Sequence, residues 1–271
     1  MSRLPAGYST WQKLNLFRHG AMQKAGYALD VFKQHFARSG LIAGQPFVAL
    51  EIGPGDSLSS AVVAAAHGAT HTYLVDAGAF ATSDMAVYRE ISAKLCAAGL
   101  NAPDLSAVQN VPDLLRTCRA SYLTRGLVSM RELPSAEVDF IWSQAVLEHV
   151  RRAEFVEFIR ETRRVLKPSG LASHVIDLQD HLGGALNNLR IGSRLWETQW
   201  MANSGFYTNR LSEPEIISAF ESAQFAVERV SELRWQDLPT LVKAFAPEFR
   251  EAHLAARYVK VFDILAKPYE R

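Results

Sequence analysis

Two acidic residues and two glycines form the clearest chemical pattern in the chain. Glu51 lies near the end of the apolar segment 47–52, and Gly53 and Gly55 follow it. Such a segment predicts a buried parallel strand, and the glycines let the backbone turn tightly and approach a ligand. Asp76 ends the next predicted strand, about twenty residues past the glycines, where a carboxylate can accept hydrogen bonds from ribose hydroxyls. The pattern predicts an adenosine-binding site at the ends of two strands.

The glycine turn does not complete the dinucleotide-binding fingerprint. In Gly-x-Gly-x-x-Gly the third glycine would stand at position 58, which is Leu58. A Tyr-x-x-x-Lys catalytic pair after the fourth predicted strand, as expected for a nicotinamide-dependent oxidoreductase or epimerase, is also missing from the sequence. That enzyme class and a binding protein that kept the fold but lost the chemistry stay open as alternatives. For Asp76, the alternative to ribose binding is a turn or helix-capping residue.

The chain resembles the class I S-adenosylmethionine-dependent methyltransferases. Their first motif, an acidic residue followed by x-Gly-x-Gly, is matched by residues 51–55, and their second-strand acid corresponds to Asp76. The resemblance extends to the blocks 138–150 and 166–170. It implies S-adenosylmethionine as the cofactor and an α/β fold. That fold is a Rossmann-like sheet of seven mostly parallel strands, the last antiparallel, with helices on both faces.

Hydrophobic periodicity predicts alternating strands and helices over most of the chain. Strands are expected at residues 47–52, 70–76, 122–128, 138–143, 171–178, 225–233 and 258–267, and helices at 60–66, 85–98, 105–119, 153–166 and 212–220. Residues 1–45 are expected to form a helical lead-in, which similar methyltransferases use as a lid, with Tyr8, Trp11 and His19 as candidates for the site wall. Residues 46–271 are expected to form the methyltransferase domain, with an acceptor-side insertion at about 179–211.

The expected adenine contact departs from the family pattern. Members with a Leu-Pro pair before the fourth strand commonly carry an acid a few residues earlier, which binds the adenine amino group. Here Leu133 and Pro134 are present, but Ser129 and Met130 replace the acid. The Ser129 hydroxyl can accept a hydrogen bond from the exocyclic amine, and the Met130 backbone amide can serve the ring. The alternative is that both residues merely end a strand.

The fourth predicted strand supplies two further candidates for the cofactor site. Residues at the carboxyl end of a strand face the ligand crevice of an open parallel sheet, which selects Ser143 and Gln144. In the resembling family, the Leu-Glu-His segment that follows packs beneath the methionine end of the cofactor, so Glu148 is expected to be structural. His149 is either a core histidine or a residue that lines the methyl-transfer cavity.

Four His and Asp residues cluster at the end of the fifth predicted strand: His174, Asp177, Asp180 and His181. A metal site is one interpretation, although strand alternation sends His174 and Asp177 to opposite faces. A second is a general base, because a sulfonium is already an activated methyl donor and only alignment and removal of a hydroxyl proton remain. A third is a set of loop caps. We predict no metal and assign His181 as the base, assisted by Asp177 or Asp180.

The segment after this cluster indicates the kind of acceptor. Residues 187–210 are rich in Asn, Arg, Trp and Tyr, which suits a polar acceptor bound by hydrogen bonds and ring faces. Together with residues 173–181, the segments Asn188-Leu-Arg190 and Asn209-Arg210 resemble a bacterial methyltransferase group associated with polysaccharide synthesis. This resemblance implies methyl transfer to a hydroxyl of a sugar or another small polar acceptor.

Composition narrows the class of protein. With 271 residues, 48% of them hydrophobic, the chain can bury a full core. A net charge of +1 gives no electrostatic reason to expect nucleic acid as a partner. Cys96 and Cys118 stand in neither a metal nor a redox spacing, which suggests reduced thiols. Because the sequence also shows no bilayer-length apolar run and no signal-peptide pattern, we expect a cytoplasmic protein.

Overall fold

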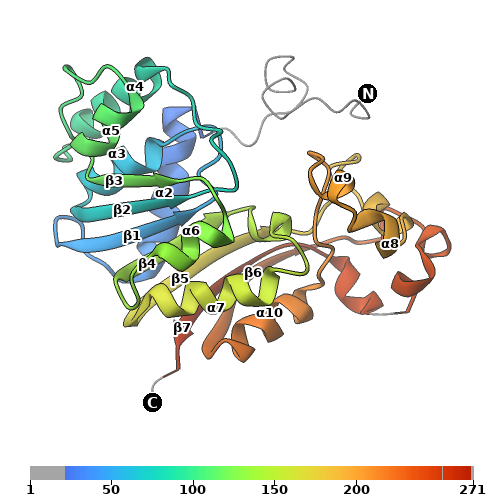
Figure 1. Ribbon diagram of the computed structural model, residues 1–271. Coiled ribbons are helices and arrows are strands. Elements are labelled where there is room, and N and C mark those ends of the chain that lie inside the picture. Colours follow the sequence, from blue (N-terminus) through green and yellow to red (C-terminus); the bar gives the residue numbers. More distant parts are fainter. Residues whose placement is uncertain (1–21, 252, 270–271) are drawn as a thin grey trace. The chain divides into compact units, whose positions relative to one another are not determined.

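The computed structural model describes residues 22–251 and 253–269, which fall into two compact units (Figure 1). The N-terminal unit contains residues 22–144, 161–173 and 267–269. The C-terminal unit contains residues 145–160, 174–251 and 253–266. The expected wall residues Tyr8, Trp11 and His19 lie outside the described residues. The expected cofactor residues belong to the N-terminal unit and the expected catalytic residues to the C-terminal unit.

Seven strands form one sheet in the order β3-β2-β1-β4-β5-β7-β6. The strands are β1 (Phe47–Ile52), β2 (Ala69–Val75), β3 (Ala120–Leu123), β4 (Val138–Gln144), β5 (Leu166–Asp177), β6 (Phe225–Arg234) and β7 (Val259–Pro268). The sheet is mostly parallel, with one antiparallel pair and helices around it, which confirms the predicted fold class. Strand β1 lies parallel to both β2 and β4, with Glu51 opposite Leu74 on one side and Trp142 on the other.

The helices alternate with the strands along the chain. The longer ones are α2 (Ala25–Ser39), α3 (Ser59–Ala66), α4 (Met85–Ala97), α5 (Val111–Thr117), α6 (Leu127–Glu132), α7 (Phe155–Val165) and α10 (Glu213–Ser222). Short helical turns are η1 (Leu147–His149), η2 (Asn187–Arg190), α8 (Ser193–Trp196), α9 (Gln199–Ala202), η3 (Val242–Ala244), η4 (Pro247–Phe249) and η5 (Leu254–Tyr258). Helix α10, predicted at 212–220, begins with a capping box, in which Ser212 and Glu215 exchange hydrogen bonds at its first turn.

The third strand is shorter than the sequence predicts. Strand β3 ends at Leu123, and Gly126, whose φ of +52° lies in the left-handed region, turns the chain before α6 begins at Leu127. Residues 127–128, expected at the end of a strand, therefore start a helix. The apolar residues there gave no clear period, and Gly126 provides the break that separates strand from helix.

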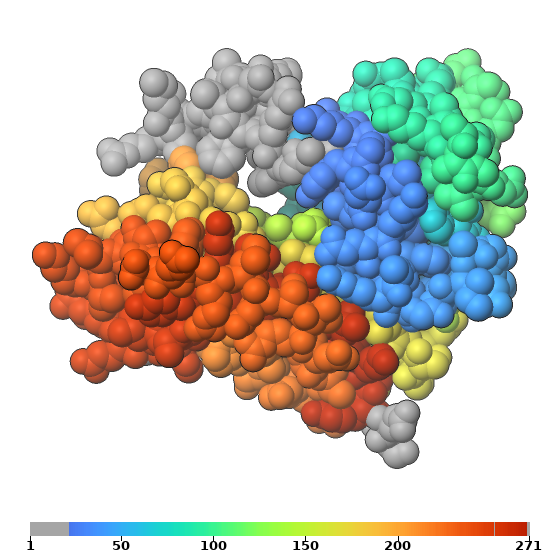
Figure 2. All heavy atoms as spheres, turned by 180° about the vertical axis from the view of Figure 1, so that it is seen from behind, coloured from blue at the N-terminus to red at the C-terminus, as the bar shows by residue number. Residues whose placement is uncertain are grey.

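Helix α2 covers one face of the sheet in the N-terminal unit and is visible in blue from behind (Figure 2). Its buried residues recur at helical spacing: Ala25, Ala28, Val31, Phe32, His35 and Phe36. Phe32 is fully buried, with its ring centroid 5.3 Å from that of Trp142 and 4.9 Å from that of His67. The same helix face carries His35, whose Nε2 donates to Gln144 Oε1 (3.1 Å). Helix α2 thus packs on β4 through Phe32 and is hydrogen-bonded to the carboxyl end of that strand through His35.

Phe32→Ala should destabilise the protein by about 3–5 kcal/mol, because it opens a cavity among aromatic rings that cannot collapse easily. Urea unfolding would measure the change in the free energy of unfolding. Tyr27→Ala on the same helix is the matched control, since Tyr27 is 39% exposed and its loss should cost less than about 1 kcal/mol. Equal losses for the two variants would contradict the assignment of Phe32 to the core.

Candidate functional site

The glycine turn after β1 has the geometry that the sequence predicts. Gly53 and Gly55 have φ values of +73° and +64°, in the left-handed region that favours glycine. Gly53 N–H donates to Val75 O (2.8 Å), and Gly55 N–H donates to Asp76 Oδ2 (2.9 Å). The turn is therefore bonded to the end of β2, and both strand ends present polar groups at one edge of the sheet.

Asp76 follows β2 and organises the backbone around it. Its Oδ1 accepts a hydrogen bond from Ala77 N–H (2.7 Å), while its Oδ2 accepts the bond from Gly55. Burial raises the pKa of the Asp76 carboxyl, and hydrogen bonds from the backbone at Gly55, Ala77 and Gly78 oppose that rise. Each carboxylate oxygen can accept more than one hydrogen bond, so the turn role of Asp76 and a ligand-binding role are compatible.

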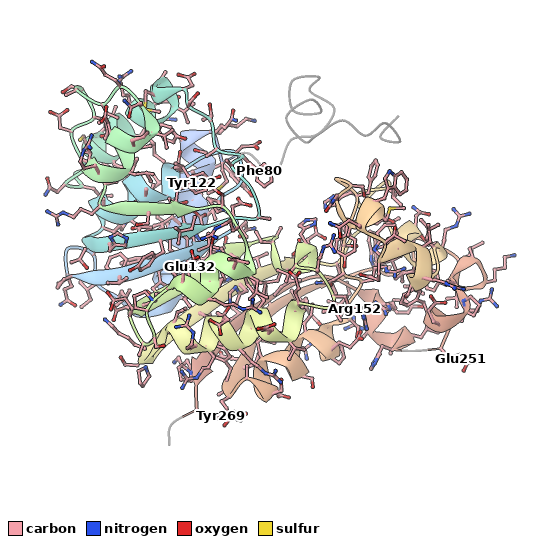
Figure 3. All side chains as sticks on the ribbon, in the orientation of Figure 1. Phe80, Tyr122, Glu132, Arg152, Glu251 and Tyr269 are labelled. Atoms are coloured by element: carbon pink, nitrogen blue, oxygen red, sulfur yellow. The ribbon has the colours of Figure 1, made fainter. Side chains whose placement is uncertain are left out.

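Tyr122 on β3 holds the loop after Asp76, a contact that the sequence analysis missed. Its hydroxyl accepts hydrogen bonds from Phe80 N–H (3.0 Å) and Ala81 N–H (3.4 Å) and donates to Gly78 O (3.0 Å). Figure 3 shows Tyr122 and Phe80 close together beside the ends of the strands. The Phe80 ring lies against Gly78, where an added Cβ would come within 2.5 Å of it. The sequence around Tyr122 shows no clear alternation of apolar and polar residues, so nothing in it indicated this role.

Glu51 is a buried carboxyl at the end of β1. It is 2% exposed, and burial raises its pKa to about 8, against a smaller opposing effect of Ser60 and Trp142. Within the described residues, Glu51 Oε2, Ser60 Oγ and Trp142 Nε1 are all buried without a hydrogen bond of good geometry. Buried polar atoms are normally satisfied, so these three atoms are candidates to bond a polar group or water.

The structure revises the expected adenine contact. Met130 lies inside α6, where its N–H donates to Gly126 O (3.1 Å) and its carbonyl accepts from Arg164 Nη2 (2.9 Å). The Met130 amide is thus used within the helix and is not free for a ring, contrary to the sequence-based expectation. Ser129 is buried, and its Oγ accepts from Arg125 N–H (3.0 Å) at the start of the same helix. Both residues belong to a helix because the strand ends earlier than expected.

Ser143 and Gln144 end β4, as predicted. Ser143 is fully buried, and Gln144 is partly buried with its Oε1 bonded to His35 Nε2. The other ring nitrogen of His35 lies 2.8 Å from Ser173 Oγ. His35, which the sequence analysis did not single out, therefore fixes the orientation of Gln144. Its only signal was its position between Phe32 and Phe36 on an apolar helix face.

In the C-terminal unit, the two carboxylates expected to assist catalysis hold loops. Asp180 is 2% exposed, and its carboxylate accepts backbone hydrogen bonds from Leu182, Ala185, Asn187 and Asn188. Asp177 accepts from the backbone and side-chain amides of Gln179 at 2.9 to 3.1 Å. Both carboxylates also influence His181 through charge, since they oppose the lowering of its pKa that burial causes.

His181 meets a second histidine. Its Nε2 lies 3.2 Å from His149 Nε2, and the two rings are nearly parallel, with centroids 4.9 Å apart. The opposite nitrogen of His149, Nδ1, lies 2.9 Å from Tyr207 O. The hydrogen-bond partner of His181 within the described residues is thus His149, and neither Asp177 nor Asp180 takes that place. Sequence spacing could not reveal the pair, because the two histidines are 32 residues apart.

A buried segment, Tyr207–Arg210, connects this pair to the rest of the C-terminal unit. Asn209 Nδ2 donates to Leu147 O (2.8 Å) and Val150 O (3.0 Å), and Asn209 N–H donates to Glu148 O (2.7 Å). The segment is therefore bonded to two carbonyl groups of η1 and to the carbonyl of Val150, which follows it. The Arg152 backbone adds a bond to the Tyr207 hydroxyl (3.1 Å), and Figure 3 shows Arg152 in this unit.

Arg210 anchors the segment from the other side. Its guanidinium donates to Ile191 O (2.6 Å) and packs over the rings of Trp196 and Phe249, 5.1 and 4.7 Å from their centroids. Arg210 belongs to the segment 187–210, which was expected to suit a polar acceptor, but it is 4% exposed and makes these internal contacts. A cavity of about 20 Å³, large enough for one water molecule, lies beside Arg210 and Glu148.

Glu148 has a structural environment, as expected from the sequence. It is 3% exposed, and burial, together with the charge of Asp177, raises its pKa well above the usual range. Within residues 22–251 and 253–269, no cluster of three or more His, Cys, Asp or Glu side chains is arranged to hold a metal ion. None of the helices in these ranges combines the length and apolar character needed to cross a membrane.

Comparison with known proteins finds a family match for part of the chain. A family model described as a methyltransferase domain matches residues 94–173. Solved structures that align with the chain include a putative methyltransferase of Haloferax volcanii in complex with the Trm112 methyltransferase activator (16% identity, 97% of this chain, 93% of that chain, TM-score 0.47). Another is an S-adenosylmethionine-dependent methyltransferase of Mesorhizobium loti (16% identity, 88% of this chain, 99% of that chain, TM-score 0.48). No curated protein sequence matches this one.

A third aligned structure is phosphoethanolamine N-methyltransferase 2 of Haemonchus contortus in complex with S-adenosyl-L-methionine. It shares 14% identity over 90% of this chain and 53% of that chain, with a TM-score of 0.49. The comparisons give no support to the nicotinamide alternative. The family match begins at residue 94, after Asp76, and is therefore independent of the glycine turn.

Glu51→Gln should change how stability depends on pH. Because the Glu51 pKa rises from 4.5 to about 8 on folding, the folded protein keeps a proton that the unfolded chain releases between these pH values. Wild-type stability should therefore fall by up to roughly 1.4 kcal/mol per pH unit across this window from this group, and level off above it. Chemical unfolding of both proteins between these pH values measures the difference.

In Glu51→Gln this contribution is lost, so the variant should become more stable relative to wild type as pH rises. Glu90→Gln serves as the control, since Glu90 is an exposed partner of Lys94 on α4 and should leave the wild-type pH dependence unchanged. Parallel curves for wild type and Glu51→Gln would show that the Glu51 carboxyl has an ordinary pKa.

Proposed function

We propose that this protein is an S-adenosylmethionine-dependent methyltransferase that acts on a hydroxyl of a sugar or another small polar acceptor. The observation that carries the proposal is the turn at Gly53 and Gly55 bonded to Asp76 beside the buried carboxyl of Glu51. The methyltransferase-domain match at residues 94–173 supports it from a different part of the chain.

The N-terminal unit has groups suited to S-adenosylmethionine. Asp76 would receive the ribose hydroxyls, and the glycine turn allows the backbone to approach the methionine end closely. The unpartnered atoms around Glu51 fit the cofactor's polar methionine end, and Glu51 would order it without acting as an acid or base. Ser129, Ser143 and Gln144 complete the proposed cofactor set. When bound, the cofactor supplies an activated methyl group.

The C-terminal unit would receive the acceptor. His181 is the proposed general base, and the loops after β5 expose polar and aromatic side chains, among them Trp200, which is 55% exposed. Such side chains suit a sugar, which offers hydroxyls for hydrogen bonds and an apolar ring face for aromatic contact. The sequence resemblance to methyltransferases of polysaccharide synthesis favours this acceptor class. Free Cys96 and Cys118 fit the cytoplasmic location that we propose.

Asp76→Asn should weaken S-adenosylmethionine binding by about tenfold to a hundredfold, because hydrogen bonds to a charged group contribute about 1.5–3 kcal/mol. Isothermal titration calorimetry measures this affinity directly. Asp84→Asn is the matched control: it removes the same charge from the same loop, where Asp84 only caps α4 through Ala86 N–H (2.9 Å). Tight binding of a nicotinamide cofactor, with no S-adenosylmethionine binding, would overturn the proposed function.

His181→Ala should leave cofactor affinity nearly unchanged and lower turnover by about a hundredfold or more, the usual contribution of a general base. Methyl transfer to a panel of glycosides and lipid-linked sugars provides the assay. His71→Ala in the N-terminal unit is the control, since His71 bonds to Ser121 (3.0 Å) away from the proposed site residues. Unchanged turnover in His181→Ala would remove His181 from the base role.

A further inference from the structure

The His149–His181 pair has a fixed hydrogen-bond direction. A carbonyl oxygen can only accept, so His149 Nδ1, 2.9 Å from Tyr207 O, must carry a proton. In a neutral His149 ring, Nε2 is then an acceptor. Because His181 Nε2 lies 3.2 Å from that nitrogen, His181 must donate from Nε2, and its own lone pair is on Nδ1.

The backbones that carry the two histidines are held in place by buried polar side chains. The Tyr207 carbonyl is placed by Asn209, whose three hydrogen bonds to the carbonyls of residues 147, 148 and 150 join the Tyr207–Arg210 segment to η1. On the other side, the Asp180 carboxylate collects backbone amides of the loop that follows His181. The pair geometry therefore depends on two clamped backbones, which limits how far either ring can move.

We propose that His149 and His181 act as one proton-accepting unit, in which the Tyr207 carbonyl orients His149, and His149 orients His181 and strengthens it as a base. This inference rests on the proposed methyltransferase function. The acceptor oxygen forms a bond to the methyl carbon as its O–H bond breaks, the carbon–sulfur bond breaks with its electrons going to sulfur, and the proton passes to His181 Nδ1. His149 is a positioning residue here, since it acts through His181.

The pair explains how His181 can accept a proton although burial disfavours the protonated form of its imidazole. Burial lowers the pKa of His181, and the charges of Asp177 and Asp180 on the β5 side oppose this. A hydrogen bond from a protonated imidazole to a neutral one is charge-assisted and stabilises the protonated form further. The ionisable neighbours of His149 in the sequence are Glu148, Arg151 and Arg152. Glu148 is buried, and burial raises its pKa well above the usual range.

The test begins on the ligand-free protein. Long-range ¹H–¹⁵N spectra of the imidazole rings should show a proton on Nδ1 of His149 and on Nε2 of His181, with each histidine assigned by its own substitution. In His149→Phe, which keeps an aromatic ring but cannot accept a hydrogen bond, the pKa of His181 should fall. An unchanged His181 titration, or His181 found with its proton on Nδ1, overturns the inference.

Kinetics supply the second readout. In His149→Phe, the acidic limb of the kcat/KM profile should move to lower pH with the His181 titration, and the plateau should fall by about tenfold or more, because a weaker base accepts a proton less readily. His149→Gln, whose side-chain amide oxygen can still accept a hydrogen bond, should recover part of the plateau. A plateau equal to wild type in His149→Phe overturns the inference.

A second variant guards against misfolding of His149→Phe. His181 is exposed as a residue, although the groups around its imidazole desolvate the ring enough to lower its pKa, so His181→Ala should fold. Removal of its hydrogen bond should move the ¹⁵N resonance of His149 Nε2 while Nδ1 stays protonated. A His149 spectrum identical to wild type overturns the pairing. If wild type transfers no methyl group to any acceptor while these spectra behave as described, the proposed function fails and the proton-sharing pair stands.

Discussion

The hydrogen bond from Gly55 N–H to Asp76 Oδ2 is the constraint on which the proposed donor site depends. Parallel strands end on the same side of a sheet, but they need not present their groups to one ligand. This bond, with that from Gly53 to Val75 O, joins the turn after β1 to the end of β2. It also requires φ values above zero at both glycines, so sequence, backbone and carboxylate orientation are determined together.

Residues 178–211 of the C-terminal unit form loops and short helical turns, which buried side chains hold in place. The helical turns there are short and stabilise little by themselves, because helix formation is costly at that length. Their positions are set instead by side chains that satisfy backbone carbonyls, chiefly Asn209 and Arg210. These turns can place two imidazoles accurately, as long as Asn209 and Arg210 keep their hydrogen bonds to the backbone carbonyls.

The sheet and the positions of the glycine turn and Asp76 at neighbouring strand ends could be predicted from sequence because each follows from a local rule. Apolar runs gave the strands β1 and β4, and the spacing from Gly55 to Asp76 gave the expected ligand edge. The short β3 and the helical position of Met130 were not predicted, because the residues 122–128 gave no clear period to separate the strand from the helix that begins after Gly126. The His149–His181 contact was also beyond local rules, because it depends on the carbonyl of Tyr207, which no side-chain pattern encodes.

The backbone of Arg210 has a φ of +58°, a conformation that costs a side-chain-bearing residue about 1 kcal/mol or more. Glycine would relieve this strain but would remove the cation between Trp196 and Phe249. Substitution of Arg210 should therefore be unfavourable: another residue with a side chain keeps the backbone strain, and glycine loses the contacts with both rings. Substitutions should be tolerated at exposed residues such as Leu195 and Trp200, and not at the buried junction around Arg210.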